Sequence, residues 1–152
     1  MVLLRKHGSG TFFWSWRPVP GAENKLFYHI STDEGFGSLG KDGLLTEESA
    51  YNPQSPYSAS KASAELIINS YQKTYDYMVT IVRPANNYGI YQQPEKLIPC
   101  SIAKLESGEN LEIYGDGQNI RHWLSVNDTI TAILTILSKG RKGEIFNIGS
   151  EY

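Results

Sequence analysis

The sequence has none of the features that indicate a disulfide-bonded, membrane-spanning, secreted or nucleic-acid-binding protein. Its single cysteine, Cys100, excludes an internal disulfide and indicates a reducing compartment. No apolar run approaches the roughly 18 residues that a membrane span needs, and the opening MVLLRKHGSG contains an apolar run too short for a secretory signal. The net charge of −2 provides no basic surface for nucleic acid. We therefore expect a soluble, cytoplasmic protein with neither a membrane nor a nucleic-acid partner.

The 152 residues suit one domain or part of a larger one, with 40% apolar and 20% charged residues. From residue 26 onward, short β-rich runs alternate with helical patterns. The predicted strands are 26–31, 79–83, 111–115, 120–126 and 144–149, and the predicted helices are 57–75, 95–108 and 127–140. This alternation, with nearly continuous apolar strands, predicts an α/β fold in which helices cover a parallel sheet.

The stretch STDEGFGSLGK, residues 31–41, contains a glycine pattern typical of a cofactor site. Residues 35–40 spell G-x-G-x-x-G, which binds a dinucleotide when a helix opens on its last glycine. The residues that follow, KDGLLTEESAYNPQSP, are polar, contain Gly43 and Pro53, and start no helix. We therefore interpret these glycines as loop residues and assign no cofactor to them.

A hydroxyl and two carboxylates, on Thr32, Asp33 and Glu34, follow the first predicted strand. In parallel α/β sheets, ligands bind beyond the carboxyl ends of the strands. This position favours a role in catalysis, whereas the alternative is an ordinary pair of loop-capping acids.

Tyr57 and Lys61 form the only Y-x-x-x-K in the chain. Residues at i and i+4 share one face of a helix, so the ammonium would lie beneath the phenol and draw the tyrosine pKa from about 10 towards neutrality. Such a group suits the general base that oxidation of an alcohol requires. Taken alone, the pattern is better explained as an ordinary first helical turn. Pro56, which helps to fix where the helix begins, and the preceding acids favour the catalytic interpretation.

Five phrases occur in one order along residues 26–150: HISTDE, SPYSASKASAE, NNYGIYQQPEKLIP, IYGDGQNIRHW and GEIFNIG. With them, the chain resembles the extended short-chain dehydrogenase/reductase family, and most closely its branch that dehydrates dTDP-glucose. The Thr-Asp-Glu triple separates this branch from sugar epimerases and decarboxylases of the family, which usually carry serine-rich or Ser/Glu versions.

The resemblance implies a partial Rossmann-like parallel sheet with helices, plus part of a smaller substrate-binding subdomain. It divides the chain into an atypical segment at 1–25, the second part of the NAD-binding domain with the catalytic residues at 26–84, and mainly nucleotide-sugar-binding elements with a returning strand at 85–152. The family's N-terminal cofactor-binding half and its C-terminal end are expected to be absent.

The resemblance also implies conversion of dTDP-glucose to dTDP-4-keto-6-deoxyglucose, with NAD as the cofactor. Tyr57 would take the proton of the sugar C4 hydroxyl while hydride passes to NAD, with Lys61 holding the phenolate and the nicotinamide ribose. Thr32 would hydrogen-bond the reacting oxygen. Glu34 would then remove the C5 hydrogen and Asp33 would protonate the departing C6 hydroxyl. Adjacent carboxylates suit these roles, because repulsion and desolvation separate their pKa values.

By the same resemblance, a nucleotide-sugar substrate and a homodimer in the full-length family are expected, with no metal. Asn87 would lie near the cofactor, and the substrate-binding residues would be Thr32, Asn86, Lys96, Leu97, Glu112, Ile113, Tyr114 and Arg121. The guanidinium fork of Arg121 suits phosphate oxygens.

The chain departs from the family at two places: Gly35-Phe36 replaces Val-Tyr, and His122 replaces an Asp beside Arg121. The alternatives are another nucleotide-sugar epimerase or decarboxylase, and a non-catalytic fragment that keeps the sugar-site scaffold.

Overall fold

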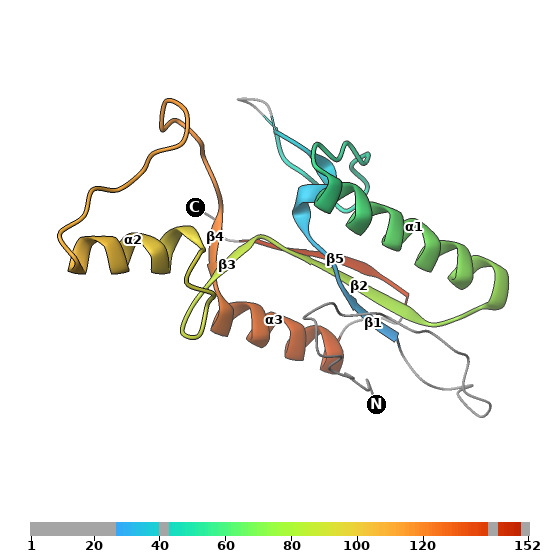
Figure 1. Cartoon of the computed structure of the whole chain (residues 1–152). Coiled ribbons are helices and arrows are strands. Elements are labelled where there is room, and N and C mark those ends of the chain that lie inside the picture. Colours follow the sequence, from blue (N-terminus) through green and yellow to red (C-terminus); the bar gives the residue numbers. More distant parts are fainter. Residues whose placement is uncertain (1–26, 40–42, 140–142, 150–152) are drawn as a thin grey trace, which may run out of the picture.

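A computed structural model describes residues 27–39, 43–139 and 143–149, so the segment 1–25 lies outside the described residues. Within these ranges, a three-stranded sheet has the order β1-β2-β5, and both pairings are parallel. Its strands are β1 (Phe27–Ile30), β2 (Val79–Pro84) and β5 (Ile145–Ile148). The predicted α/β fold with a parallel sheet is therefore confirmed (Figure 1).

Two helices lie on opposite faces of this sheet, α1 (Pro56–Tyr75) and α3 (Val126–Lys139) (Figure 1). Successive side chains of a strand point to opposite faces. Val82 of β2 packs in a core cluster with residues of α3, and the next residue, Arg83, contacts α1 through Glu65. Burial on both faces explains why every residue of β2 is buried and why its sequence reads as an unbroken β-rich run.

Beyond β2, a second, two-stranded parallel sheet joins β3 (Asn86–Tyr88) to β4 (Trp123–Ser125), with Asn86 opposite Trp123. The remaining helix, α2 (Leu97–Glu106), lies between these strands in the sequence. The sequence pattern did not predict β3, because Asn-Asn-Tyr has no apolar alternation.

The strand predicted at residues 111–115 is wrong, since this segment has no regular structure. Ile113 and Tyr114 are 73% and 79% exposed, and Gly115 and Gly117 have positive φ values of 67° and 73°. The apolar pattern finds no neighbouring strand among the described residues, so no ladder forms.

In the part of the chain that the structure describes, no helix combines the length with the apolar content that crossing a bilayer requires. The same residues include no cluster of three or more His, Cys, Asp or Glu arranged to hold a metal ion.

Candidate active site

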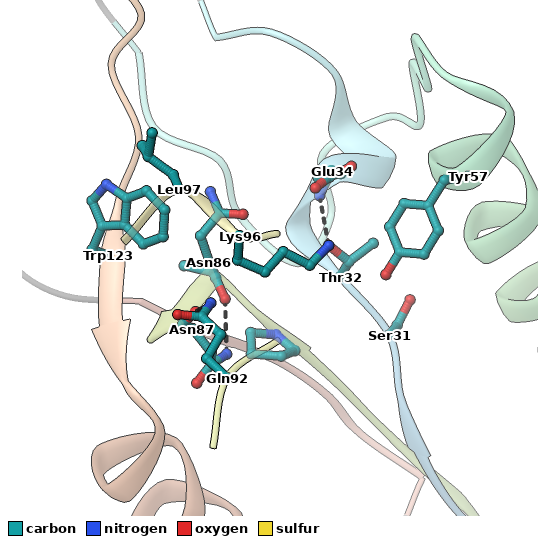
Figure 2. A pocket seen from close by; sticks show the side chains of 12 residues that line it. Ser31, Thr32, Glu34, Tyr57, Asn86, Asn87, Gln92, Lys96, Leu97 and Trp123 are labelled. Carbon is teal, nitrogen blue, oxygen red and sulfur yellow. Dashed lines mark hydrogen bonds between the residues drawn. The ribbon is translucent and has the colours of Figure 1, made fainter. Parts of the chain in front are cut away.

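A pocket of about 430 Å³ lies at the carboxyl ends of β1 and β2, where parallel sheets bind their ligands. This volume is typical of a small-molecule site. Figure 2 shows α1 on one side of the pocket and β4 on the other. Its lining residues are Ser31, Thr32, Glu34, Tyr57, Pro84, Ala85, Asn86, Asn87, Gln92, Lys96, Leu97 and Trp123.

The acid segment after β1 forms η1 (Asp33–Phe36), a single turn of 3₁₀ helix. Thr32 caps this turn in an extended conformation, and its Oγ1 accepts a hydrogen bond from the backbone N–H of Glu34 at 3.3 Å. The same hydroxyl donates to Asp33 Oδ1 at 3.4 Å. The cap thus fixes the backbone that carries both carboxylates, and it leaves Glu34 exposed at the pocket.

Tyr57 is placed by the start of α1. Ser55 precedes the helix, and its Oγ accepts from the Ser58 N–H at 3.1 Å while its own N–H donates to Ser58 Oγ at 3.0 Å. This reciprocal capping, with Pro56 at the first helical position, sets where the helix begins. The Tyr57 ring consequently points from the first turn into the pocket, towards Thr32 and Ser31 (Figure 2).

The charges around Tyr57 differ from those expected from the sequence. Burial raises the pKa of Tyr57, and the carboxylates of Glu34 and Asp33 raise it further. Lys61 instead donates from Nζ to the backbone carbonyl of Ile30 at 3.1 Å, at the end of β1. The expectation that Lys61 lowers the tyrosine pKa is therefore wrong for this structure, because burial and the two carboxylates together raise it.

Asp33 binds a proton more readily than an ordinary aspartate. Burial raises its pKa, and the neighbouring Glu34 raises it further. Hydrogen bonds from its own backbone and from Thr32 oppose this shift, as does the charge of His122. A half-buried carboxyl beside a second acid is an arrangement in which the first carboxyl holds its proton more tightly.

The side of the pocket opposite Tyr57 is formed around Asn87. Its Nδ2 donates to the carbonyl of Ala85 at 3.0 Å, and its Oδ1 accepts from the Thr129 hydroxyl. Gln92 Nε2 donates to the Asn87 carbonyl at 2.9 Å. These bonds hold the amide wall to β3 and α3, so it has a defined shape before any ligand binds.

The structure brings seven of the sequence-predicted residues to the pocket and leaves the others outside its lining. Glu112 forms an exposed ion pair with Lys104 at 3.0 Å, and Arg121 is exposed with Nη1 donating to the Ile120 carbonyl. The residues in the pocket are Thr32, Glu34, Tyr57, Asn86, Asn87, Lys96 and Leu97. Those outside are Asp33, Lys61, Glu112, Ile113, Tyr114 and Arg121.

Sequence reasoning missed five lining residues: Ser31, Pro84, Ala85, Gln92 and Trp123. Three of these directly follow or end strands β1 and β2, so the rule for the carboxyl ends of strands could have found them. Trp123 reaches the pocket through the pairing of β4 with β3, which no sequence signal indicated.

Gly37 ends the acid turn in a backbone conformation that only glycine adopts readily, with φ 76° and ψ −160°. A Cβ at this position would lie 2.2 Å from the backbone oxygen of Asn52. We expect Gly37→Ala to lower the free energy of unfolding by more than the roughly 1–3 kcal/mol of backbone strain, because the loop must also move. Urea unfolding measures this change.

Gly108→Ala is the matched control. Gly108 also has a positive φ of 71°, but a Cβ there would meet nothing within 4 Å. It should therefore report the backbone strain alone. Equal losses of stability in the two variants would contradict the close approach of Asn52 to the acid turn.

Comparisons with known proteins agree on one family. The family model for the NAD dependent epimerase/dehydratase family matches residues 20–149. A dTDP-glucose 4,6-dehydratase of Xanthomonas campestris pv. campestris is 47% identical over 136 residues, covering 88% of this chain and 39% of that protein. The crystal structure of dTDP-glucose 4,6-dehydratase from Bacillus anthracis, in complex with NAD, superposes with a TM-score of 0.80 at 52% identity, covering 82% of this chain and 40% of that one.

A related enzyme of different activity also matches. The UDP-glucuronic acid 4-epimerase of Bacillus cereus, solved with UDP-glucuronic acid and NAD, has a TM-score of 0.78 at 30% identity, covering 84% of this chain and 40% of that one. The chain thus spans about two fifths of the length of the relatives that it matches.

Proposed function

The chain belongs to the NAD dependent epimerase/dehydratase family, and on that premise we propose that it carries the sugar-facing part of a dehydratase active site. The proposed reaction converts dTDP-glucose to dTDP-4-keto-6-deoxyglucose by oxidation, water elimination and re-reduction. The observation that carries the proposal is one pocket that joins the Tyr57 phenol to Thr32 and Glu34, beside an Asp33 whose pKa is raised.

Two of the described residues, Tyr57 and Lys61, suit the nicotinamide end of NAD. The Tyr57 hydroxyl points into the pocket, and the Lys61 ammonium lies at the carboxyl end of β1 with one of its three N–H groups on the Ile30 carbonyl. We assign these two residues and Asn87 to the cofactor side. NAD, when bound, would accept a hydride from sugar C4 and return one to C6, and its positively charged ring would counter the carboxylates that raise the Tyr57 pKa.

The other side chains divide the proton transfers. Tyr57 Oη would take the proton of the C4 hydroxyl, and the Thr32 hydroxyl would hydrogen-bond that oxygen. Glu34, exposed at the pocket, would remove the C5 proton and return a proton to C5 when hydride is added at C6. Asp33, whose pKa is raised by burial and by Glu34, would donate to the leaving C6 hydroxyl.

For the nucleotide end, Asn86, Lys96 and Leu97 are supported by their place in the pocket lining. We keep Glu112, Ile113, Tyr114 and Arg121 as proposed contacts on the strength of the family resemblance. The division at residue 84, a homodimer and a cytoplasmic location likewise stay proposals.

The second candidate is epimerisation of a nucleotide sugar, which the match to the UDP-glucuronic acid 4-epimerase favours. Epimerisation needs the tyrosine but no acid that protonates a leaving hydroxyl. The half-buried Asp33 beside the exposed Glu34 is therefore the feature that supports dehydration over epimerisation.

Mass spectrometry separates these reactions. The chain is incubated with NAD and either dTDP-glucose or UDP-glucuronic acid. Dehydration removes one water from dTDP-glucose, whereas epimerisation leaves the mass unchanged and alters only the configuration, which NMR detects. Absence of water loss, together with no binding of dTDP-glucose or NAD by calorimetry, would reject the proposal and favour a non-catalytic scaffold.

A further inference from the structure

Behind the pocket, two charged side chains are almost completely removed from water. Glu65 of α1 is 1% exposed and Arg83 of β2 is 2% exposed. Arg83 Nε approaches both carboxylate oxygens, at 3.2 and 2.9 Å, and Nη2 donates to Oε2 at 2.7 Å. The two residues therefore form a forked, charge-assisted ion pair between a helix and the central strand.

The pair contacts both ends of the acid segment. At its beginning, the Ser31 hydroxyl donates to Glu65 Oε1, directly before Thr32. At its end, the Arg83 guanidinium lies over the Phe36 ring, 4.8 Å from the ring centre. Thr32, Asp33 and Glu34 lie between these two contacts.

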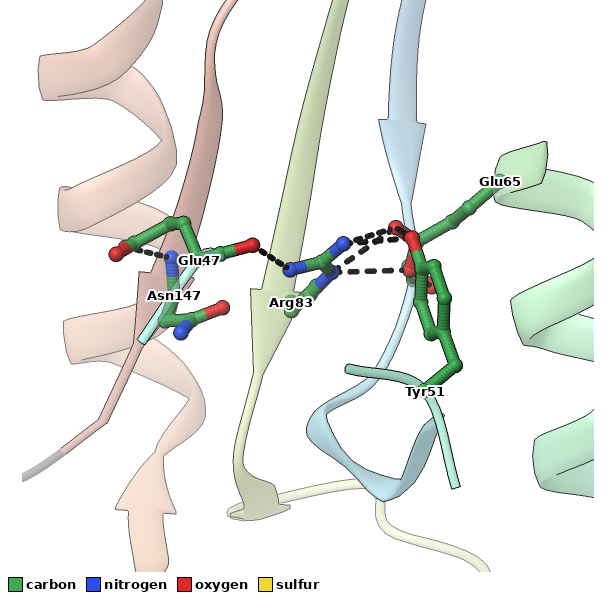
Figure 3. A network of polar contacts seen from close by, with 6 residues as sticks. Glu47, Tyr51, Glu65, Arg83 and Asn147 are labelled. Carbon is green, nitrogen blue, oxygen red and sulfur yellow. Dashed lines mark hydrogen bonds and ion pairs between the residues drawn. The ribbon is translucent and has the colours of Figure 1, made fainter. Parts of the chain in front are cut away.

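The loop that closes over the pair completes its hydrogen bonds (Figure 3). Tyr51 donates to Glu65 Oε2 at 2.9 Å and accepts from Arg83 Nη2 at 2.7 Å. Arg83 Nη1 donates to the Glu47 carbonyl at 3.2 Å, and the Glu47 carboxylate accepts from the backbone N–H of Asn147. Burial acts to raise the pKa of Glu65, but the hydrogen bonds from Arg83, Ser31 and Tyr51 outweigh it and lower the pKa.

We propose that Glu65 and Arg83 are positioning residues, which hold the segment from Ser31 to Phe36 so that its hydroxyl and carboxylates face Tyr57. Glu65 also lies on α1, one turn after Lys61 and two turns after Tyr57. One ion pair thus connects the segment with the acids to the helix with the phenol. The inference rests on the proposed function for the roles of the residues that it positions.

Stability alone does not account for this pair. Burying two charges costs hydration, and well-packed apolar residues of similar volume usually replace a buried ion pair without loss of stability. The pair does supply fixed directions, because the guanidinium fork and the carboxylate each meet several partners at defined angles. A displacement of about 1 Å in a catalytic group can reduce turnover roughly a hundredfold.

The double variant Glu65→Leu with Arg83→Met tests this role. We expect it to remain folded, while amide hydrogen exchange accelerates about tenfold or more at Gly37 and Asn52, whose N–H groups bond to Glu34 and Gly35. Exchange in α2 should not change. In the dehydration assay, kcat should fall about a hundredfold while KM stays within roughly threefold. A folded double variant with unchanged exchange at Gly37 and Asn52 and unchanged kcat would overturn the inference.

Two further variants test the positioning role if the double variant does not fold, and provide a control. Arg83→Lys retains the charge but loses the fork, so it should accelerate exchange at the same two amides even if the double variant does not fold. Lys104→Gln removes the exposed ion pair on α2 and should leave those amides unchanged. If Arg83→Lys accelerates exchange uniformly throughout the chain, the ion pair is purely structural. If it accelerates exchange at neither amide, the pair does not hold the acid segment. Either result would overturn the inference.

The exchange measurement needs neither substrate nor cofactor. If the wild-type chain forms no dehydrated product and binds neither dTDP-glucose nor NAD, the proposed function fails, while hydrogen exchange still decides whether the pair positions the acid segment. If product forms and exchange at Gly37 and Asn52 is unaffected in the folded variants, only the positioning inference fails.

Discussion

Replacing Tyr57 with phenylalanine should lower the turnover of dTDP-glucose by about 10²–10⁴-fold, the usual effect of removing a general base. The hydroxyl is the only group lost, and it points into the pocket between Thr32 and Ser31 (Figure 2). Oxidation of the C4 alcohol cannot begin unless a base takes its proton. Steady-state kinetics with dTDP-glucose and NAD measures the change.

The matched control for this variant is Tyr75→Phe. Tyr75 ends the same helix and is 68% exposed, so it removes the same atom far from the pocket. Tyr75→Phe should retain wild-type turnover. The unfolding midpoints of both variants should stay near that of the wild type. If Tyr57→Phe keeps more than about a tenth of the activity, another group takes the proton and the assignment of Tyr57 is wrong.

Replacing Ile81 with alanine should lower the free energy of unfolding by about 2–5 kcal/mol, as deletion of buried methyl and methylene groups does elsewhere. Ile81 is 1% exposed in the middle of β2, with His29 of β1 on one side and Ile145 of β5 on the other. The total stability of a domain is only about 5–15 kcal/mol. Loss of this one side chain therefore removes a large share of it, which urea unfolding would detect as a lower midpoint.

Ile90→Ala gives the comparison, because Ile90 is 80% exposed and changes by the same atoms. Its effect should stay within about 0.5 kcal/mol. A loss of less than about 1 kcal/mol in Ile81→Ala would mean that the site collapses around the smaller side chain, and that the centre of the sheet is not the rigid core described above.

The sheet that carries the site could be predicted from the sequence, while the second sheet could not. Strands β1, β2 and β5 each have a β-rich run with clear ends, and Pro56 indicated the start of α1. Strand β3 has no such run and exists because β4 pairs with it, whereas the apolar segment 111–115 finds no partner. Strand identity in short segments depends on which neighbour is present, and a local pattern does not contain that information.

The same distinction applies to the site. Thr32, Glu34 and Tyr57 were predicted because strand ends and helix starts are local features. The direction of the Tyr57 pKa shift was not predicted, because it is set by burial and by the carboxylates of Glu34 and Asp33, which depend on how the elements pack. The ion pair of Glu65 and Arg83 connects α1 to β2, and no local sequence pattern predicted it.

The hydrogen bond from the Asn147 N–H to the Glu47 carboxylate, 2.8 Å long, joins residues 100 positions apart. During synthesis on the ribosome, α1 and Tyr57 emerge well before β5. The loop that contains Glu47 therefore lacks this hydrogen bond until residue 147 has been made. Contacts between such distant residues also form late and slowly in refolding. The region where Glu47 contacts Arg83 and Asn147 should accordingly be one of the last to reach its final structure in a newly synthesised chain, long after the local helices have formed.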